Sequence, residues 1–204
     1  MTEYDYREDA GKYDEQVKEY DSYAHDAMFG MSYEYVKPND KLLDLGIGTG
    51  LASINFSEIG LKVYGLDVSD EMLNVCRNKS FTEELKVHNL LDKRIPYNDN
   101  YFNHIICSGV FHFLGDLDNI FSEVARIIRK DGIFAFTIAP GKVRDYTKQM
   151  TSWGVPIYNH STDYIMRLLD KNRMNLLKEL RLLLKGADKV NYDMLFSIMI
   201  TKCG

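Results

Sequence analysis

Cysteine and proline are scarce in this chain of 204 residues, which contains three cysteines and four prolines. Cys76, Cys107 and Cys203 are odd in number and lie far apart, and none belongs to a Cys-x-x-Cys pair. This pattern argues against a disulfide framework and suggests no structural metal, so each is expected to be a small buried residue. We therefore expect a cytoplasmic protein in a reducing environment, with no bound metal.

Long apolar runs and an excess of basic residues are also missing. No apolar run approaches the ~20 residues of a membrane span, and residues 1–15 lack the basic and apolar segments of a secretory signal. The net charge of −5 argues against a nucleic-acid-binding surface, because phosphate contacts need a basic face. With 45% hydrophobic and 27% charged residues, the composition is that of one globular domain, as a monomer or a homodimer.

A glycine-rich turn stands between two short apolar runs, residues 42–45 and 63–66. The turn is followed by a segment of helical period, so the pattern predicts a strand, a tight turn and a helix over residues 49–59, which is half of a βαβ unit. Without a Cβ, Gly46, Gly48 and Gly50 let the turn take positive φ and let a ligand approach the backbone. The unpaired N–H groups of the helix start face the same place.

The spacing of these glycines separates two classes of cofactor. A dinucleotide site needs its third glycine at position 51, which is Leu51, whereas the third glycine here is Gly50. With Asp44 before the turn and Asp67 after the second apolar run, the Asp-x-Gly-x-Gly-x-Gly pattern resembles motifs I and II of the class I S-adenosylmethionine (SAM) methyltransferases. This resemblance implies an α/β fold with a Rossmann-like, doubly wound sheet of seven strands, mostly parallel with an antiparallel C-terminal strand.

The resemblance also implies roles for the residues around the turn. Asp44 acts on the ammonium of SAM, directly or through water, and Asp67 accepts both ribose hydroxyls in charge-assisted bonds. Val68 covers one face of the purine ring, and Met72, behind the expected helix cap Ser69, belongs to the same cofactor site. A similar turn that binds another nucleotide-like ligand is the alternative.

The N-terminal residues 1–36 carry apolar side chains at helical spacing and predict one or two helices with a break near residues 29–31. Residues 10–14 resemble the start of the small-molecule methyltransferases of ubiquinone and menaquinone biosynthesis, in which such helices fold over the cofactor as a lid. Tyr13 and Tyr20 are the expected lid contacts. The alternative is a surface helix whose tyrosines pack on the edge of the sheet.

A departure from the family pattern follows the third strand, which we expect at residues 85–88. The family places an acid there to bind the adenine amino group, but this chain has Asn89. The amide oxygen of Asn89 can accept that hydrogen bond, and the N–H of Leu90 can donate to the ring. Asp92, three residues later, is the competing candidate for the adenine contact.

The fourth strand, expected at residues 104–108, is an apolar run typical of a strand that is buried on both faces. Ligands of open α/β sheets bind outside the carboxyl ends of the strands, at the point where the strand order reverses. Ser108, Gly109 and Val110 follow this strand and are therefore expected to surround the methionine tail and the methyl group.

His112 is the candidate catalytic residue, as a general base for a hydroxyl or phenol acceptor, and His160 is the other candidate. A histidine between two phenylalanines is more often a packed residue. Methyl transfer from a sulfonium chiefly needs alignment and exclusion of water, so an enzyme of this kind can do without a base.

The C-terminal third varies most in such proteins, and we expect it to select the substrate. The pattern predicts a helix at residues 117–129, a strand at 132–138 and a polar loop at 139–160. A capped helix at 162–171 and two closing strands at 174–184 and 192–202 follow. The first closing segment satisfies the helical period as well. The expected parts are an N-terminal helical lid (1–36), a SAM-binding core (37–140) and a C-terminal, substrate-side part of the same domain (141–204).

The predicted function is transfer of a methyl group from SAM to a small, neutral or apolar acceptor, with S-adenosylhomocysteine as the product. A catalytically silent SAM-binding module that acts as a sensor or partner subunit is the second interpretation. An NAD(P)-linked oxidoreductase is a distant third.

Overall fold

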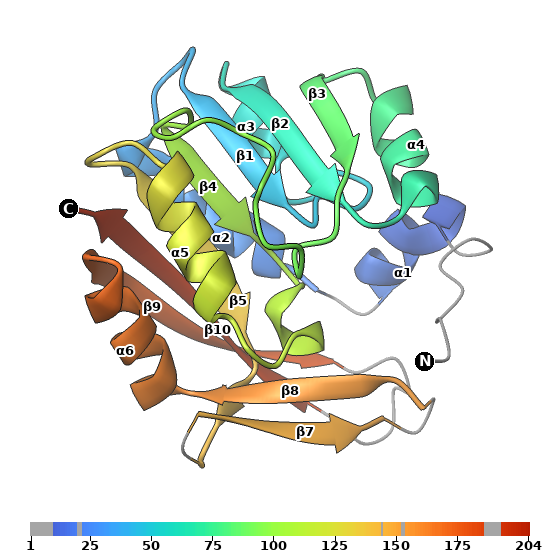
Figure 1. Cartoon of the computed structure of the whole chain (residues 1–204). Coiled ribbons are helices and arrows are strands. Elements are labelled where there is room, and N and C mark those ends of the chain that lie inside the picture. Colours follow the sequence, from blue (N-terminus) through green and yellow to red (C-terminus); the bar gives the residue numbers. More distant parts are fainter. Residues whose placement is uncertain (1–9, 20–21, 144, 152–153, 186–192) are drawn as a thin grey trace.

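A computed structural model of the chain describes residues 10–19, 22–143, 145–151, 154–185 and 193–204. Its centre is a seven-stranded sheet in the order β3-β2-β1-β4-β5-β10-β9 (Figure 1). The strands are β1 (Lys41–Leu45), β2 (Lys62–Asp67), β3 (Thr82–Val87), β4 (His104–Cys107), β5 (Ile133–Ile138), β9 (Met174–Lys185) and β10 (Asp193–Cys203). Strands β1 to β5 are parallel and β10 is antiparallel to both of its neighbours, which confirms the predicted fold class.

Helices cover both faces of this sheet (Figure 1). The helices are α1 (Tyr13–Glu19), α2 (Ala24–Ser32), α3 (Ile54–Glu58), α4 (Asp70–Asn78), α5 (Asp118–Ile127) and α6 (Thr162–Lys171), with short 3-10 turns η1 (Ala10–Lys12), η2 (Tyr33–Tyr35) and η3 (Phe111–Phe113). Side chains of α2, α3 and α4 share one core cluster with the sheet, and those of α5 and α6 share the other. Among the described residues, every helix is too short or too polar to span a membrane.

The alternation of side chains along the central strands builds the two cores. On β5, Phe134 and Phe136 pack toward α5, whereas Ile133 and Ala135 pack toward α2. All residues of β4 and β5 are buried, as expected for strands covered on both faces. The centre of the sheet is therefore packed on both faces.

The helix predicted over residues 49–59 is shorter than expected. The N–H groups of Gly46 and Ile47 both donate to the carbonyl of Leu66, and Gly50 N donates to Ile47 O. These bonds keep the chain in turns, so that α3 begins only at Ile54. The helix ends at the predicted place, because Gly60 has a φ of 91°.

The predicted break near residues 29–31 is wrong. Helix α2 runs through these residues, and the interruption lies between α1 and α2. Met28 is fully buried, and the ring of Phe29 packs edge-on against Phe56 with centroids 5.0 Å apart. Gly30 is tolerated in the helix because packing of its neighbours stabilises this turn, although glycine alone weakens a helix.

The polar loop predicted over residues 139–160 is also wrong, because described residues of this segment form a second, three-stranded sheet. Its strands β6 (Pro140–Gly141), β7 (Tyr146–Met150) and β8 (Pro156–Ser161) lie in the order β6-β8-β7. Non-local pairing and contact between β8 and η3 stabilise them. Such pairing has little local signal in the sequence. The two closing strands are confirmed as β9 and β10, so the ambiguous segment 174–184 is a strand.

Candidate functional site

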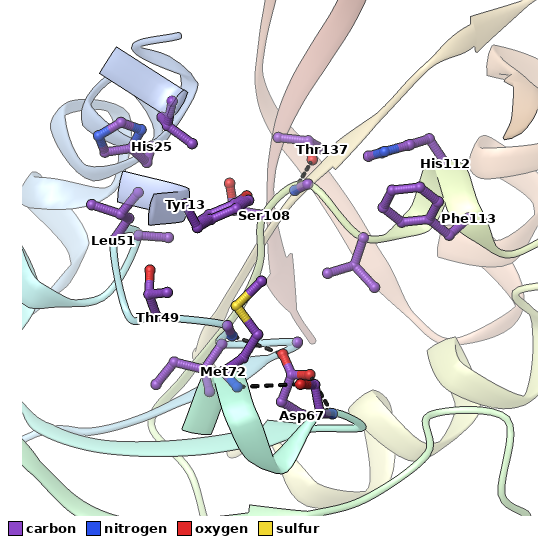
Figure 2. Close-up of a pocket in the computed structure, with 18 of the residues that line it drawn as sticks. Tyr13, His25, Thr49, Leu51, Asp67, Met72, Ser108, His112, Phe113 and Thr137 are labelled. Carbon is purple, nitrogen blue, oxygen red and sulfur yellow. Dashed lines mark hydrogen bonds between the residues drawn. The ribbon is translucent and has the colours of Figure 1, made fainter. Parts of the chain in front are cut away.

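A pocket of roughly 530 Å³ opens at the carboxyl ends of β1, β2 and β4. In Figure 2, Tyr13, His25 and Leu51 lie on one side of it, and His112 and Phe113 lie on the opposite side. The strand order reverses between β1 and β4, so the pocket occupies the switch point where open α/β sheets bind ligands. The residues predicted for the cofactor that line it are Tyr13, Gly46, Gly48, Asp67, Val68, Met72, Asn89, Leu90, Ser108 and Gly109.

Two glycines of the turn face the pocket and the third does not. Gly46 and Gly48 line it with φ of 74° and 53°, and a Cβ on Gly48 would meet no atom within 4 Å. Gly50 lies outside the lining, and a Cβ there would stand 2.5 Å from Cζ of Phe81. The structure therefore gives Gly50 a packing role against α4 and the start of β3, and leaves the first two glycines for close approach of a ligand.

Asp67 lies at the end of β2 with its carboxylate fixed by the backbone of two loops. Its Oδ2 accepts from Gly48 N at 2.8 Å and its Oδ1 accepts from Ser69 N at 2.9 Å (Figure 2). Burial raises the pKa of Asp67, against the lowering effect of these backbone bonds. Each carboxylate oxygen has two lone pairs, so both retain one for a ligand diol.

Asp44 is placed differently from the prediction. Its side chain is buried beneath the turn, outside the pocket lining, and neither carboxylate oxygen has a hydrogen-bond partner among the described residues. Burial raises its pKa to about 7, with the nearby Ser53 hydroxyl opposing the rise and the charge of Asp67 adding to it. An interaction of Asp44 with a ligand ammonium must therefore act at longer range or through water.

The loop after β3 brings an unpredicted histidine to the pocket. His88 lines the pocket beside Asn89, and its Nε2 is buried without a partner among the described residues. The amide oxygen of Asn89 already accepts from Leu91 N at 3.0 Å. Asp92, the competing candidate, does not line the pocket, and its Oδ2 lies 3.8 Å from His88 Nδ1.

The loop after β4 is held by a residue of the neighbouring strand. Gly109 has a φ of 71°, and its N–H donates to Thr137 Oγ1 at 2.8 Å (Figure 2). Thr137, on β5, is almost fully buried and lines the pocket, as does Phe196 of β10. Neither residue was predicted, because nothing local in β5 or β10 indicates which inward-facing side chain reaches the end of another strand.

His112 lines the pocket on η3, between two aromatic rings. Its ring centroid lies 3.9 Å from that of Phe113 and 5.3 Å from that of Phe196. Its Nδ1 is buried and has no partner among the described residues. Burial, together with the nearby His160, lowers the pKa of His112 to about 4, so the imidazole is neutral at pH 7.

His160, the second candidate base, does not reach the pocket. It is fully buried on β8, and its Nε2 lies 3.0 Å from Gly115 O. The hydroxyl of Tyr164 donates to Asp116 and accepts from Leu117 N, at 3.0 and 2.8 Å. These contacts join the loop that follows η3 to the second sheet and to α6. His160 therefore has a structural role.

The N-terminal helix α1 is fastened to the glycine turn by the last residue of the 10–14 motif, for which the sequence predicted no such role. Asp14 accepts from Thr49 Oγ1, and it also forms an ion pair with Lys79 at the end of α4. Tyr13, next to it, lines the pocket, as do residues of α1 and the start of α2. Tyr20, the other predicted lid contact, lies outside the described residues.

Comparison with known proteins agrees with this geometry. Residues 43–136 match the methyltransferase domain family. The uncharacterized methyltransferase YcgJ of Bacillus subtilis is 31% identical over 99 residues, which are 46% of this chain and 38% of that protein. The ubiquinone biosynthesis O-methyltransferase of Pelagibacter ubique is 24% identical over 167 residues, or 77% of this chain and 67% of that protein.

A solved structure extends the likeness beyond the matched residues. The S-adenosylmethionine dependent methyltransferase from Mesorhizobium loti has a TM-score of 0.69 at 17% identity, covering 86% of this chain and 97% of that one. At this identity the likeness shows the fold alone. The sequence match spans well under half the length of YcgJ.

Proposed function

We propose that the protein transfers a methyl group from SAM to a small-molecule acceptor, since residues 43–136 match the methyltransferase domain family within a class I methyltransferase fold. The observation that carries the proposal is Asp67, whose carboxylate is held over the pocket by Gly48 N and Ser69 N with lone pairs left free. Ribose hydroxyls would complete these bonds, and S-adenosylhomocysteine would be the product.

The rest of the cofactor fits the same edge of the sheet. The amino-acid tail would lie along Gly46 and Gly48, where backbone approaches closely, and Val68 and Leu90 offer apolar surface to the adenine. SAM supplies an electrophilic methyl on its sulfonium when bound. Residues of the chain then align the acceptor and exclude water, which is the larger part of such catalysis.

The acceptor that suits this pocket is uncharged. Among its described lining residues, Asp67 is the acid and there is no lysine or arginine, so an anionic acceptor would have no cation to pair with. The far side, around His112, Phe113 and Phe196, is mostly aromatic. A neutral imidazole can orient a hydroxyl by hydrogen bonding and accept its proton as the methyl transfers, although its low pKa makes it a weak base.

Helix α1 would serve as a lid in this scheme. Asp14 joins it to the turn through Thr49 and to α4 through Lys79, and it thereby places Tyr13 at the pocket. Closing such a cover excludes water from the reacting sulfonium and commits the bound acceptor.

Calorimetry with SAM, S-adenosylhomocysteine and NAD tests the cofactor. We expect both adenosyl compounds to bind and NAD not to bind; the reverse would overturn the proposal. Incubation of a metabolite extract with methyl-labelled SAM then tests the reaction. Tight SAM binding without label in any product would favour the silent sensor or partner subunit.

A further inference from the structure

Strand β9 is an edge of the central sheet. It pairs with β10 on one side, and none of the described strands pairs with its other side (Figure 1). Outside the ladder with β10, no backbone hydrogen bond joins the N–H and C=O groups of its twelve residues to another described residue. An open edge of this length is a ready template for another strand, and natural proteins usually protect it.

The features that usually keep a sheet edge from pairing with another strand are weak along most of β9. A register shift opposite Leu177 interrupts the ladder, but pairing is regular from Lys178 to Lys185. The Lys178 ammonium is turned toward α2 and η2, where it donates to Met31 O at 3.0 Å and pairs with Glu34, so it does not guard the edge.

Leucine side chains stay accessible along this edge. Leu177, Leu180 and Leu183 are 39%, 38% and 65% exposed, and Leu195 on the adjacent strand is 40% exposed. Removing these side chains from water would favour association, at roughly 25 cal/mol per Å² of apolar surface.

We propose that two copies of the chain pair antiparallel through β9, about a two-fold axis at Leu180. Residues whose numbers sum to 360 then lie opposite one another. Glu179 of each copy faces Arg181 of the other, on one face of the joined sheet and within the regular stretch that begins at Lys178. Within one chain Arg181 Nε already lies 2.9 Å from Glu179 Oε1, so the four side chains form one alternating cluster. Opposite charges across strands stabilise a pair, and like charges destabilise it.

Neighbouring registers lack this complementarity. An axis at Glu179 or at Arg181 would set that residue opposite its own copy, with like charges in contact. An axis midway between residues 179 and 180 sets Lys178 opposite Arg181, and one midway between residues 180 and 181 forms no ion pair. The charge pattern of the strand thus selects the axis at Leu180 from its neighbours.

Sedimentation equilibrium tests the pairing. We expect a species of twice the 23.6 kDa chain mass in the micromolar range. Glu179→Arg alone, or Arg181→Glu alone, should weaken the dimer about tenfold or more, because two ion pairs become like-charge contacts. The two variants mixed should dimerise with each other, and the double exchange should restore the homodimer. Unchanged thermal unfolding of each variant shows that its fold is intact.

Cross-linking tests the axis. Leu180→Cys should form a disulfide between copies on mild oxidation, because that residue faces itself, whereas the matched variant Leu183→Cys should not. The native cysteines are buried and do not compete. The proposal would be overturned if the wild-type chain stayed monomeric. It would also be overturned if Glu179→Arg and Arg181→Glu both left the dissociation constant of the dimer unchanged.

Discussion

The cofactor side and the acceptor side of the pocket are built in different ways. The cofactor side comes from consecutive turns after β1, β2 and β3, and a short stretch of sequence contains its glycines and Asp67. The acceptor side gathers η3, Thr137 and Phe196 from three distant segments. The first could be recognised by spacing, and the second exists only after the sheet has formed.

The two sides also contain buried titratable groups with opposite behaviour. Burial raises the pKa of Asp44 to about 7 beneath the cofactor turn, and lowers the pKa of His112 to about 4 on the acceptor side. The same desolvation disfavours the charged form of both groups, of which one is an acid and the other a base. Four changes separate the two sides, and those that act on ligand affinity or turnover run from the largest expected effect to the smallest.

The first change adds a side chain to the cofactor turn. In Gly46→Val the new Cβ would stand 2.4 Å from Val110 Cγ2, at a φ of 74°. We expect SAM affinity to fall more than 100-fold, which is about 3 kcal/mol, measured by calorimetry, while circular dichroism shows that the apo fold persists at reduced stability. Gly50→Ala is the matched control, because its Cβ clashes with Phe81 outside the pocket. Gly50→Ala should lower the stability of the fold and leave the affinity for SAM unchanged. An equal loss of SAM affinity in both variants would contradict the different roles of Gly46 and Gly50.

Asp44→Asn should change the pH dependence of stability. The pKa of Asp44 in the folded chain, about 7, lies above the ordinary 3.8. The free energy of unfolding of the native chain therefore falls as pH rises from 4 to 7, and it stays constant above pH 7. The full difference is roughly 4 kcal/mol at pH 8. Urea unfolding of Asp44→Asn should give no such fall in the free energy of unfolding between pH 5 and pH 8. An unchanged pH profile would show that Asp44 is not buried as a neutral acid.

Asp67→Asn tests the ribose contact. The amide cannot accept through both of its terminal atoms, so one backbone donor or one ribose hydroxyl loses its partner. We expect SAM affinity to fall by about 1.5–3 kcal/mol, as for charge-assisted bonds lost from a partly buried site. Calorimetry with S-adenosylhomocysteine should give the same loss, since both ligands carry the same ribose. Unchanged affinity for both would remove Asp67 from the ribose role.

His112→Phe tests the acceptor side. We expect unchanged SAM affinity and a kcat/KM for the acceptor reduced about 10- to 100-fold, or about 1.4–2.7 kcal/mol. Since the folded pKa of His112 lies near 4, below the ordinary 6.5, native stability falls as pH drops through this interval, and the variant should lose less. Weakened SAM binding with unchanged kcat/KM would place His112 on the cofactor side instead.

Sequence alone determined the parts of this protein that depend on local chemistry. The strands of the central sheet, the positive-φ glycines and the capped starts of α4 and α6 follow from short patterns, and the structure confirms these elements. Even here the spacing could not show that Gly50 packs against Phe81, or that Asp44 lies beneath the pocket.

Tertiary structure decided the rest. The second sheet, the anchoring of α1 by Asp14, and the aromatic acceptor wall arise from contacts between segments far apart in the chain. The physical reason is that a side chain is buried, or a strand is paired, only where the folded sheet offers a surface or an edge for it. A residue such as Phe196 acquires its place only from the strands beside it.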